Sequence, residues 1–302
     1  MTIFYVHRGN PFYLKYSLAQ TRERFPHAQI VLLGDESNRN LVRFVEYHPL
    51  EGYSLAARDF AGQYVHLSPN LVEFELFCIQ RWFFVEEFVR LHGVEGPLVY
   101  LDSDVLVYEN VFEELVQKNM ALATTRELGP AFTFFRDPSV LAGLVAFIHR
   151  AYTDPTLLST LRGIFETGVS PFFLQGKYVS DMQLLGLYYR TLTETLDLGT
   201  FWPDVAFDYA FHTAEGYSFN PYKRIKRLWW RDGHPYGKRK GSLVRFAGLH
   251  FQVGTKIYLP LYYRGSFRFN DLWKYRLIHL RGAVTTALKF ILDCGRKWRE
   301  SK

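Results

Sequence analysis

Two aspartates separated by one serine are the residues whose types and spacing most directly suggest chemistry in this sequence of 302 residues. Asp102 and Asp104 follow the apolar run VYL at 99–101 and precede the run VLV at 105–107. Carboxylates at the first and third positions of a tight loop can point toward one centre, where a divalent cation offsets their repulsion. Mg²⁺ and Mn²⁺ sites combine such carboxylates with phosphate oxygens of a substrate. The pattern predicts a metal site for a phosphorylated ligand; the alternative is a plain acidic turn.

The elements that must position this pair alternate between strand and helix. Apolar runs predict buried strands, and amphipathic patterns predict helices. The expected strands cover 2–7, 28–35 and the run ending at Asp104, and the expected helices cover 13–25 and from Asn70 to about His92. Continuous apolar strands separated by helices indicate an α/β fold with a mostly parallel sheet and helices on both faces. In such sheets ligands bind at the carboxyl ends of the strands, where His7, Asp35 and both aspartates of the pair lie.

The second half of the chain is less regular. Strands are expected over 120–125 and 131–136, and helices over 139–152 and 178–192. After about residue 200 the periodicity weakens and glycine, proline and aromatic residues gather, which predicts a loop-rich half-domain that shapes a substrate cleft.

Composition and charge narrow the class of protein. There are two cysteines, with no metal or redox spacing, so no disulfide framework is expected and Cys78 is assigned to the core. The first residues show no signal peptide and no run is apolar enough to cross a bilayer, so we expect a cytoplasmic protein. A formal charge of +6 indicates an anionic partner.

The strand that ends in D-x-D resembles the signature of the nucleotide-sugar glycosyltransferases of the GT-A fold. The run RWFFVEEFVRLHGVEGPLVYLDSDVLVYENV looks like their nucleotide-binding half. The resemblance implies an enzyme with Mn²⁺ or Mg²⁺, a UDP-sugar as the expected donor, and a glycan or glycolipid acceptor. It implies one catalytic domain over 1–269, with a nucleotide-binding half at about 1–125 and an acceptor half at 126–269. Its implied donor-binding residues at this edge are Val6, His7, Asp102 and Ser103.

A downstream segment, HFQVGTK at 250–256, resembles the H-x-x-G-x-x-K segment of the family that contains glycogenin and the lipooligosaccharide galactosyltransferases. There the histidine completes the metal shell and the lysine holds the diphosphate, which implies these roles for His250 and Lys256. The glycine, Gly254, stands one position later than in the family pattern. The alternatives are a core histidine and a solvated lysine.

Three further residues are candidates for the donor and for catalysis. Arg81 lies 21 residues before Asp102 on a predicted helix, where related enzymes carry an arginine that reaches the donor; its alternative is an exposed helix residue. Asp181 begins a predicted helix, at a point where the resembling enzymes place an acid in the sugar pocket. It is the candidate base for an inverting reaction, and its alternative is an acid favoured by the helix dipole. Asp208 is the second candidate base.

Two basic features leave the partner open. The segment 222–241 carries lysines and arginines around Trp229 and Trp230, and 270–302 has the spacing of a basic amphipathic helix. Such a helix predicts peripheral membrane contact, or packing on its own domain. Basic patches with aromatic residues also suit nucleic acid, which is the less favoured acceptor.

Two other functions compete with sugar transfer. A nucleotidyltransferase or another metal-dependent phosphoryl-transfer enzyme also pairs carboxylates on a metal, but the chain has no G-x-x-x-x-G-K-[ST] segment. A non-catalytic membrane-binding or nucleic-acid-binding protein, with purely structural aspartates, is the alternative of another class.

Overall fold

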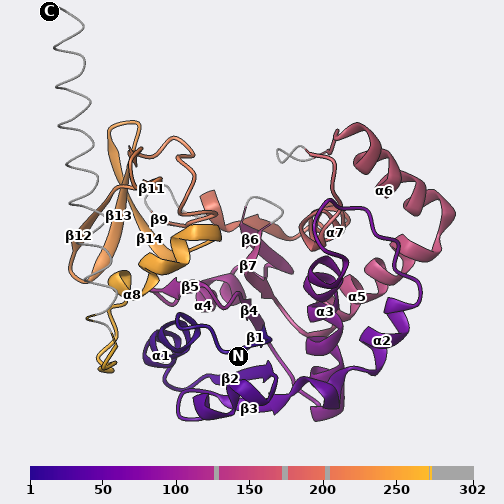
Figure 1. Ribbon diagram of the computed structural model, residues 1–302, viewed down its shortest axis with the longest axis horizontal. Coiled ribbons are helices and arrows are strands. Elements are labelled where there is room, and N and C mark those ends of the chain that lie inside the picture. The colour runs from indigo at the N-terminus through magenta and orange to yellow at the C-terminus, as the bar shows by residue number, and fades with distance from the viewer. Residues whose placement is uncertain (126–128, 172–175, 201–204, 272, 274–302) are drawn as a thin grey trace, which may run out of the picture.

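The computed structural model describes residues 1–302 except 126–128, 172–175, 201–204, 272 and 274–302 (Figure 1). Its main element is a seven-stranded sheet, in which four of the six neighbouring pairs are parallel and β7 is antiparallel to both of its neighbours. The strands, in spatial order, are β3 (Glu46–Pro49), β2 (Gln29–Gly34), β1 (Thr2–His7), β4 (Leu98–Leu101), β7 (Gly129–Phe135), β6 (Leu122–Thr125) and β8 (Thr195–Asp197).

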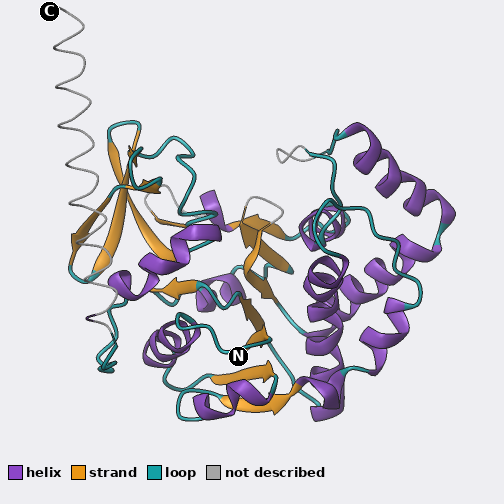
Figure 2. Ribbon diagram, in the orientation of Figure 1, coloured by secondary structure: helices purple, strands orange, loops and turns teal. Residues whose placement is uncertain are grey.

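Helices cover both faces of this sheet (Figure 2), and alternate strand residues supply the two cores. In β1, Phe4 and Val6 join the core beneath the larger group of helices, whereas Ile3 and Tyr5 join the opposite core. The larger group comprises α2 (Leu55–Ala61), α3 (Val72–His92), α5 (Pro138–Thr153), α6 (Pro155–Thr167) and α7 (Asp181–Tyr189). The opposite core contains α1 (Leu14–Arg24) and α4 (Phe112–Gln117). The predicted α/β class, with a mostly parallel sheet and helices on both faces, is confirmed.

A second sheet lies against the face that carries α1 and α4, and it corrects the expectation of a loop-rich region after residue 200. Its order is β12 (Leu228–Arg231), β13 (His234–Arg239), β14 (Ser242–His250) and β5 (Val105–Val107), and β9 (Val205–Phe207) also pairs with β14. The short pair β10 (Phe219–Asn220) and β11 (Ile225–Lys226) lies beside it. The basic segment 222–241 is therefore largely strand.

Two tight turns build this second sheet. Asp232 and Gly233 connect β12 to β13 with φ of 48° and 77°, and Lys240 and Gly241 connect β13 to β14 with φ of 49° and 90°. Two-residue hairpin turns with positive φ at both positions match the twist of the flanking strands. The Asp-Gly pair was thus a hairpin signal, but short strands broken by glycine and proline hide the alternation around it.

The connection between the two sheets positions the acidic pair. β4 ends at Leu101 in the first sheet, and β5 begins at Val105 in the second. Residues 102–104 are therefore the turn that carries the chain from one sheet to the other. Four 3₁₀ segments and one short helix complete the described elements: η1 (Glu36–Leu41), η2 (Leu50–Tyr53), η3 (Leu198–Thr200), η4 (Val253–Tyr258) and α8 (Leu259–Tyr262).

The predicted basic helix over 270–302 lies outside the described residues, apart from 270, 271 and 273. Within the part of the chain that the structure describes, every helix is too short or too polar to cross a bilayer. The division of 1–269 near residue 125 stays a prediction, and β5 of the first half pairs with β14 of the second.

Candidate metal centre

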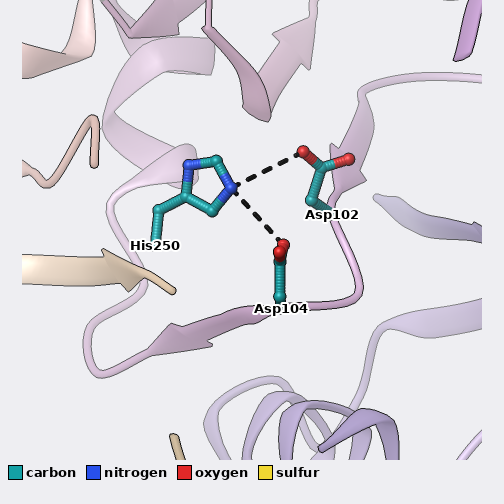
Figure 3. A group of neighbouring side chains, drawn as sticks. All are labelled: Asp102, Asp104 and His250. Carbon is teal, nitrogen blue, oxygen red and sulfur yellow. Dashed lines mark ion pairs between the residues drawn. The ribbon is translucent and has the colours of Figure 1, made fainter. Parts of the chain in front are cut away.

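Strand register brings His250 to the two aspartates. β14 runs antiparallel to β5 with His250, its last residue, opposite Val105, and the N–H of Phe251 donates to the carbonyl of Asp104 at 2.9 Å. The imidazole Nε2 then points at both carboxylates (Figure 3), 3.4 Å from Asp104 Oδ1 and 3.8 Å from Asp102 Oδ2. One potential ligand atom from each of the three residues lies within 4.8 Å of the others.

The other ring nitrogen fixes the tautomer of His250. Its Nδ1 lies 2.8 Å from the carbonyl oxygen of Tyr209, which accepts only, so Nδ1 carries the hydrogen and the lone pair of Nε2 faces the aspartates. Burial lowers the pKa of His250, but the charges of Asp104 and Asp102 more than offset this and raise it. A positive charge is therefore favoured at this point, as a proton or as a metal ion.

This donor set fits a divalent cation. Two carboxylates suit Mg²⁺ and Mn²⁺, and the imidazole nitrogen, a softer ligand, favours Mn²⁺ of the two. Asp104 is 6% exposed; burial raises its pKa, yet His250 and Lys256 lower it further than burial raises it. The carboxylate is thus ionised at neutral pH and ready to bind a cation.

Lys256 places a second positive charge beside the cluster. Its Nζ lies 3.0 Å from Asp104 Oδ2 and 3.4 Å from the hydroxyl of Tyr13, above whose ring it also sits. Burial lowers the pKa of Lys256, but Asp104 and Tyr13 raise it above its usual value. The Lys256 side chain is partly exposed and lines the cavity, so it can also contact an anionic ligand.

Arg81 organises the opposite side from the middle of α3. One guanidinium nitrogen donates to the hydroxyl of Tyr100 at 2.9 Å and to Asp102 Oδ1 at 2.5 Å, and another forms an ion pair with Asp181. The fork therefore fixes one oxygen of Asp102, while Oδ2 faces His250. The structure places Arg81 among carboxylates, where it orients Asp102 of the candidate metal site.

Asp181 is the first residue of α7, whose N-cap Ser180 forms a capping box with Gln183. Burial raises the pKa of Asp181 to about 6, although the ion pair with Arg81 opposes the shift and nearby Asp102 adds to it. The Asp181 carboxylate therefore takes up a proton at a much higher pH than the Asp104 carboxylate does.

These side chains surround one cavity of about 520 Å³. Nine of the ten site residues predicted from the sequence line it: Val6, His7, Arg81, Asp102, Ser103, Asp104, Asp181, His250 and Lys256. Burial lowers the pKa of His7 to about 4; the charge of Asp104 opposes this shift and that of Lys256 adds to it. His7 is therefore uncharged at neutral pH where it lines the cavity. The structure brings these residues together, and their individual roles stay predictions.

Asp208 is the exception. Its side chain is fully buried beneath His250, outside the cavity lining, with Oδ1 2.5 Å from Nζ of Lys226 and Oδ2 accepting the backbone N–H of His250 at 3.3 Å. An acceptor hydroxyl cannot reach a carboxylate sealed in this way. The geometry therefore contradicts the proposal of Asp208 as the base and gives it a role in holding the end of β14.

Two other expectations change. Cys78 was assigned to the core, but it is only partly buried and lines the cavity, where burial raises the pKa of its thiol to about 12. Asp35, at the end of β2, caps η1 and accepts the N–H of Gly9, so it shapes the loop after β1. The contacts of the Tyr13 and Tyr100 hydroxyls with Lys256 and Arg81 could not be predicted from the sequence, because they depend on tertiary packing.

Comparisons with known proteins found no matching family model and no matching curated sequence. Among solved structures, mouse xyloside xylosyltransferase 1 in its apo form is similar over 68% of this chain and 87% of its own, with 11% identity and a TM-score of 0.44. The galactosyltransferase LgtC in complex with donor and acceptor sugar analogs is similar over 91% and 100%, with 12% identity and a TM-score of 0.43. Because these values are low, the function is inferred below from the side chains of the cavity.

Proposed function

We propose that this protein is a metal-dependent glycosyltransferase that transfers a sugar from a nucleoside-diphosphate sugar, with UDP as the expected nucleotide, to a hydroxyl of a glycan or glycolipid. The observation that carries the proposal is the cluster of Asp102, Asp104 and His250 at the wall of a 520 Å³ cavity, with Lys256 beside it. Two carboxylates, one imidazole and a cation suit a diphosphate bound with its metal ion.

The metal site assigns the first roles. Asp102 through Oδ2, Asp104 and His250 through Nε2 would hold Mn²⁺ or Mg²⁺. When bound, the ion supplies positive charge that stabilises the departing nucleoside diphosphate. Lys256 adds a fixed ammonium group to the same leaving group, and Arg81 keeps Asp102 in its binding orientation.

Asp181 is the proposed polar contact on the other side of the cavity. Its carboxylate lines the cavity from the start of α7 and is held by Arg81. We assign it to a hydroxyl of the sugar or of the acceptor, where a carboxyl with a pKa of about 6 can accept a proton near neutral pH. Peripheral membrane contact and a cytoplasmic location stay predictions, as does the less favoured nucleic-acid acceptor.

A donor screen tests this function against the competing ones. The purified chain is mixed with Mn²⁺ and with UDP-sugars, GDP-sugars or nucleoside triphosphates, and its melting temperature and release of nucleoside diphosphate are measured. We expect stabilisation and slow hydrolysis with UDP-sugars, loss of both in EDTA, and recovery with added Mn²⁺.

Two results would contradict the proposal. Stabilisation by triphosphates with release of pyrophosphate indicates nucleotidyl transfer. Binding of none of these nucleotides, with or without metal, indicates that the aspartates form an acidic turn.

A further inference from the structure

Val253 has a backbone conformation that its side chain disfavours. Six described non-glycine residues have positive φ, and five of them are polar or charged: Asn119, Glu215, Arg224, Asp232 and Lys240. Val253, with φ of 52°, is the one β-branched residue among the six. For a β-branched residue the left-handed region is a genuine outlier, because Cβ substituents crowd the backbone.

Packing of the Val253 side chain against the rest of the protein does not offset the energetic cost of this backbone conformation. Val253 is 75% exposed, and it lines the cavity that contains the acidic pair. The neighbouring Gly254 has an ordinary φ, and a Cβ built on it would meet no atom within 4 Å. Position 254 thus does not need a glycine, because its backbone and surroundings would accept a side chain. Position 253, where a glycine would be unstrained, carries a valine instead.

The position of Val253 relates it to the metal centre. It is the first residue of the 3₁₀ segment η4. His250 precedes Val253 by three residues at the end of β14, Lys256 follows it by three, and all three residues line the same cavity. Val253 thus lines the cavity together with the groups that we assign to the metal and the diphosphate.

We propose that Val253 is a specificity-determining residue, whose methyl groups contact the sugar portion of the donor where it leaves the diphosphate. The inference rests on the proposed function. Strained backbone persists where the surrounding structure and a ligand-binding role maintain it. Methyl groups offer no hydrogen bond to phosphate, but they pack against the C–H face of a sugar.

The test compares binding of two probes, UDP and UDP-galactose, each with Mn²⁺, to wild type, Val253→Gly and Val253→Ala by isothermal titration calorimetry. We expect both variants to bind UDP as wild type does and to bind UDP-galactose about tenfold more weakly, since one methylene in a pocket changes discrimination by at least about tenfold. Val253→Gly should also melt at an equal or higher temperature, because glycine accepts the left-handed conformation. Ile257→Ala, on the same 3₁₀ segment but outside the cavity lining, is the control and should leave both affinities unchanged.

The outcomes separate the two proposals. If wild type binds neither UDP nor UDP-galactose, the proposed function fails, and this inference fails with it. If wild type binds both and the two Val253 variants keep the wild-type ratio of affinities, the function stands and the sugar contact is wrong. Weakening in Val253→Gly alone would also overturn the contact, since it would point to a need for a rigid backbone.

Discussion

Two Asp–Lys pairs contact the same histidine, one at its imidazole and the other at its backbone N–H, and they differ in their surroundings. Asp104 and Lys256 line the cavity, and the Lys256 side chain is partly exposed there. Asp208 and Lys226 are fully buried, and Asp208 accepts the backbone N–H of His250. The ammonium of Lys226 donates to Asp208, to Glu215 and to the carbonyl of Ala210, so all three of its hydrogens are used.

The comparison shows that residue type alone does not separate a binding pair from a structural one. A charged pair that is sealed and fully hydrogen-bonded fixes the backbone around it but cannot meet a ligand. A pair at a cavity wall keeps its charges available. We therefore expect changes in the buried pair to act on stability, and changes in the cavity pair to act on binding and turnover.

The largest expected effect belongs to the buried pair. Lys226→Met leaves Asp208 and Glu215 without their cation, and removing one partner of a buried ion pair costs about 3–5 kcal/mol. Urea unfolding should show this loss in the free energy of unfolding. The matched control is Lys256→Met, which should lose less than about 1 kcal/mol because its partly exposed pair is weaker. Equal losses in both variants would remove the distinction between the pairs.

The cavity pair should dominate turnover. Asp104→Asn removes one negative charge from the proposed metal site, so we expect turnover to fall at least about a hundredfold, equivalent to roughly 2.7 kcal/mol. The melting temperature in metal-free buffer should also fall, because the ionised Asp104 pairs with His250 and Lys256, but by less than the loss of turnover implies, since asparagine suits the turn. Asp35→Asn changes an aspartate at another strand end outside the cavity lining and should keep wild-type turnover. If activity in Asp104→Asn fell only as much as melting temperature predicts, residues 102–104 would be an acidic turn.

A smaller effect distinguishes Asp181 from Asp104. The pKa of Asp181 is raised from 3.8 to about 6 by burial. The folded state then binds the proton more tightly than the unfolded state, so this group lowers stability as pH rises from about 4 to about 6. Between pH 5 and pH 7 in EDTA, wild type should lose about 1 kcal/mol more of its unfolding free energy than Asp181→Asn loses.

Urea unfolding of both chains at each pH measures this difference. The comparison with the variant cancels the opposing contribution of His7, whose lowered pKa destabilises the fold at acid pH. An identical pH dependence in the two chains would show that Asp181 keeps an ordinary pKa.

The sequence predicted the cluster of Asp102 and Asp104 at a cavity wall because local signals coincide there. A buried strand that ends in two aspartates needs no tertiary information, and the α/β alternation of the first hundred residues predicts which sheet edge they occupy. The strand β14 was harder to predict, because its pairing with β5 depends on a register that links residues 107 and 248. The position of His250 was available through resemblance alone.

The corrections to Asp208 and to the region after residue 200 have a common cause. Asp208 and Asp181 are both acids beside apolar residues in the sequence. Only the fold shows that Asp208 is buried against Lys226, whereas Asp181 lines the cavity. The second sheet was missed because its strands are short, although Asp232-Gly233 marked a hairpin. Local pattern predicts an element, whereas burial and charge partners come from contacts distant in sequence.

The most direct test of the account is whether one Mn²⁺ binds to His250 and the aspartate pair. Electron paramagnetic resonance of Mn²⁺ titrated with protein and UDP measures the number of bound ions, and electron spin echo modulation detects a histidine nitrogen in the metal shell. The account predicts one ion per chain with a nitrogen coupling that disappears in His250→Gln, and affinity at least about tenfold weaker in Asp104→Asn. Binding of Mn²⁺ without a nitrogen coupling in wild type, or unchanged affinity in Asp104→Asn, would contradict it.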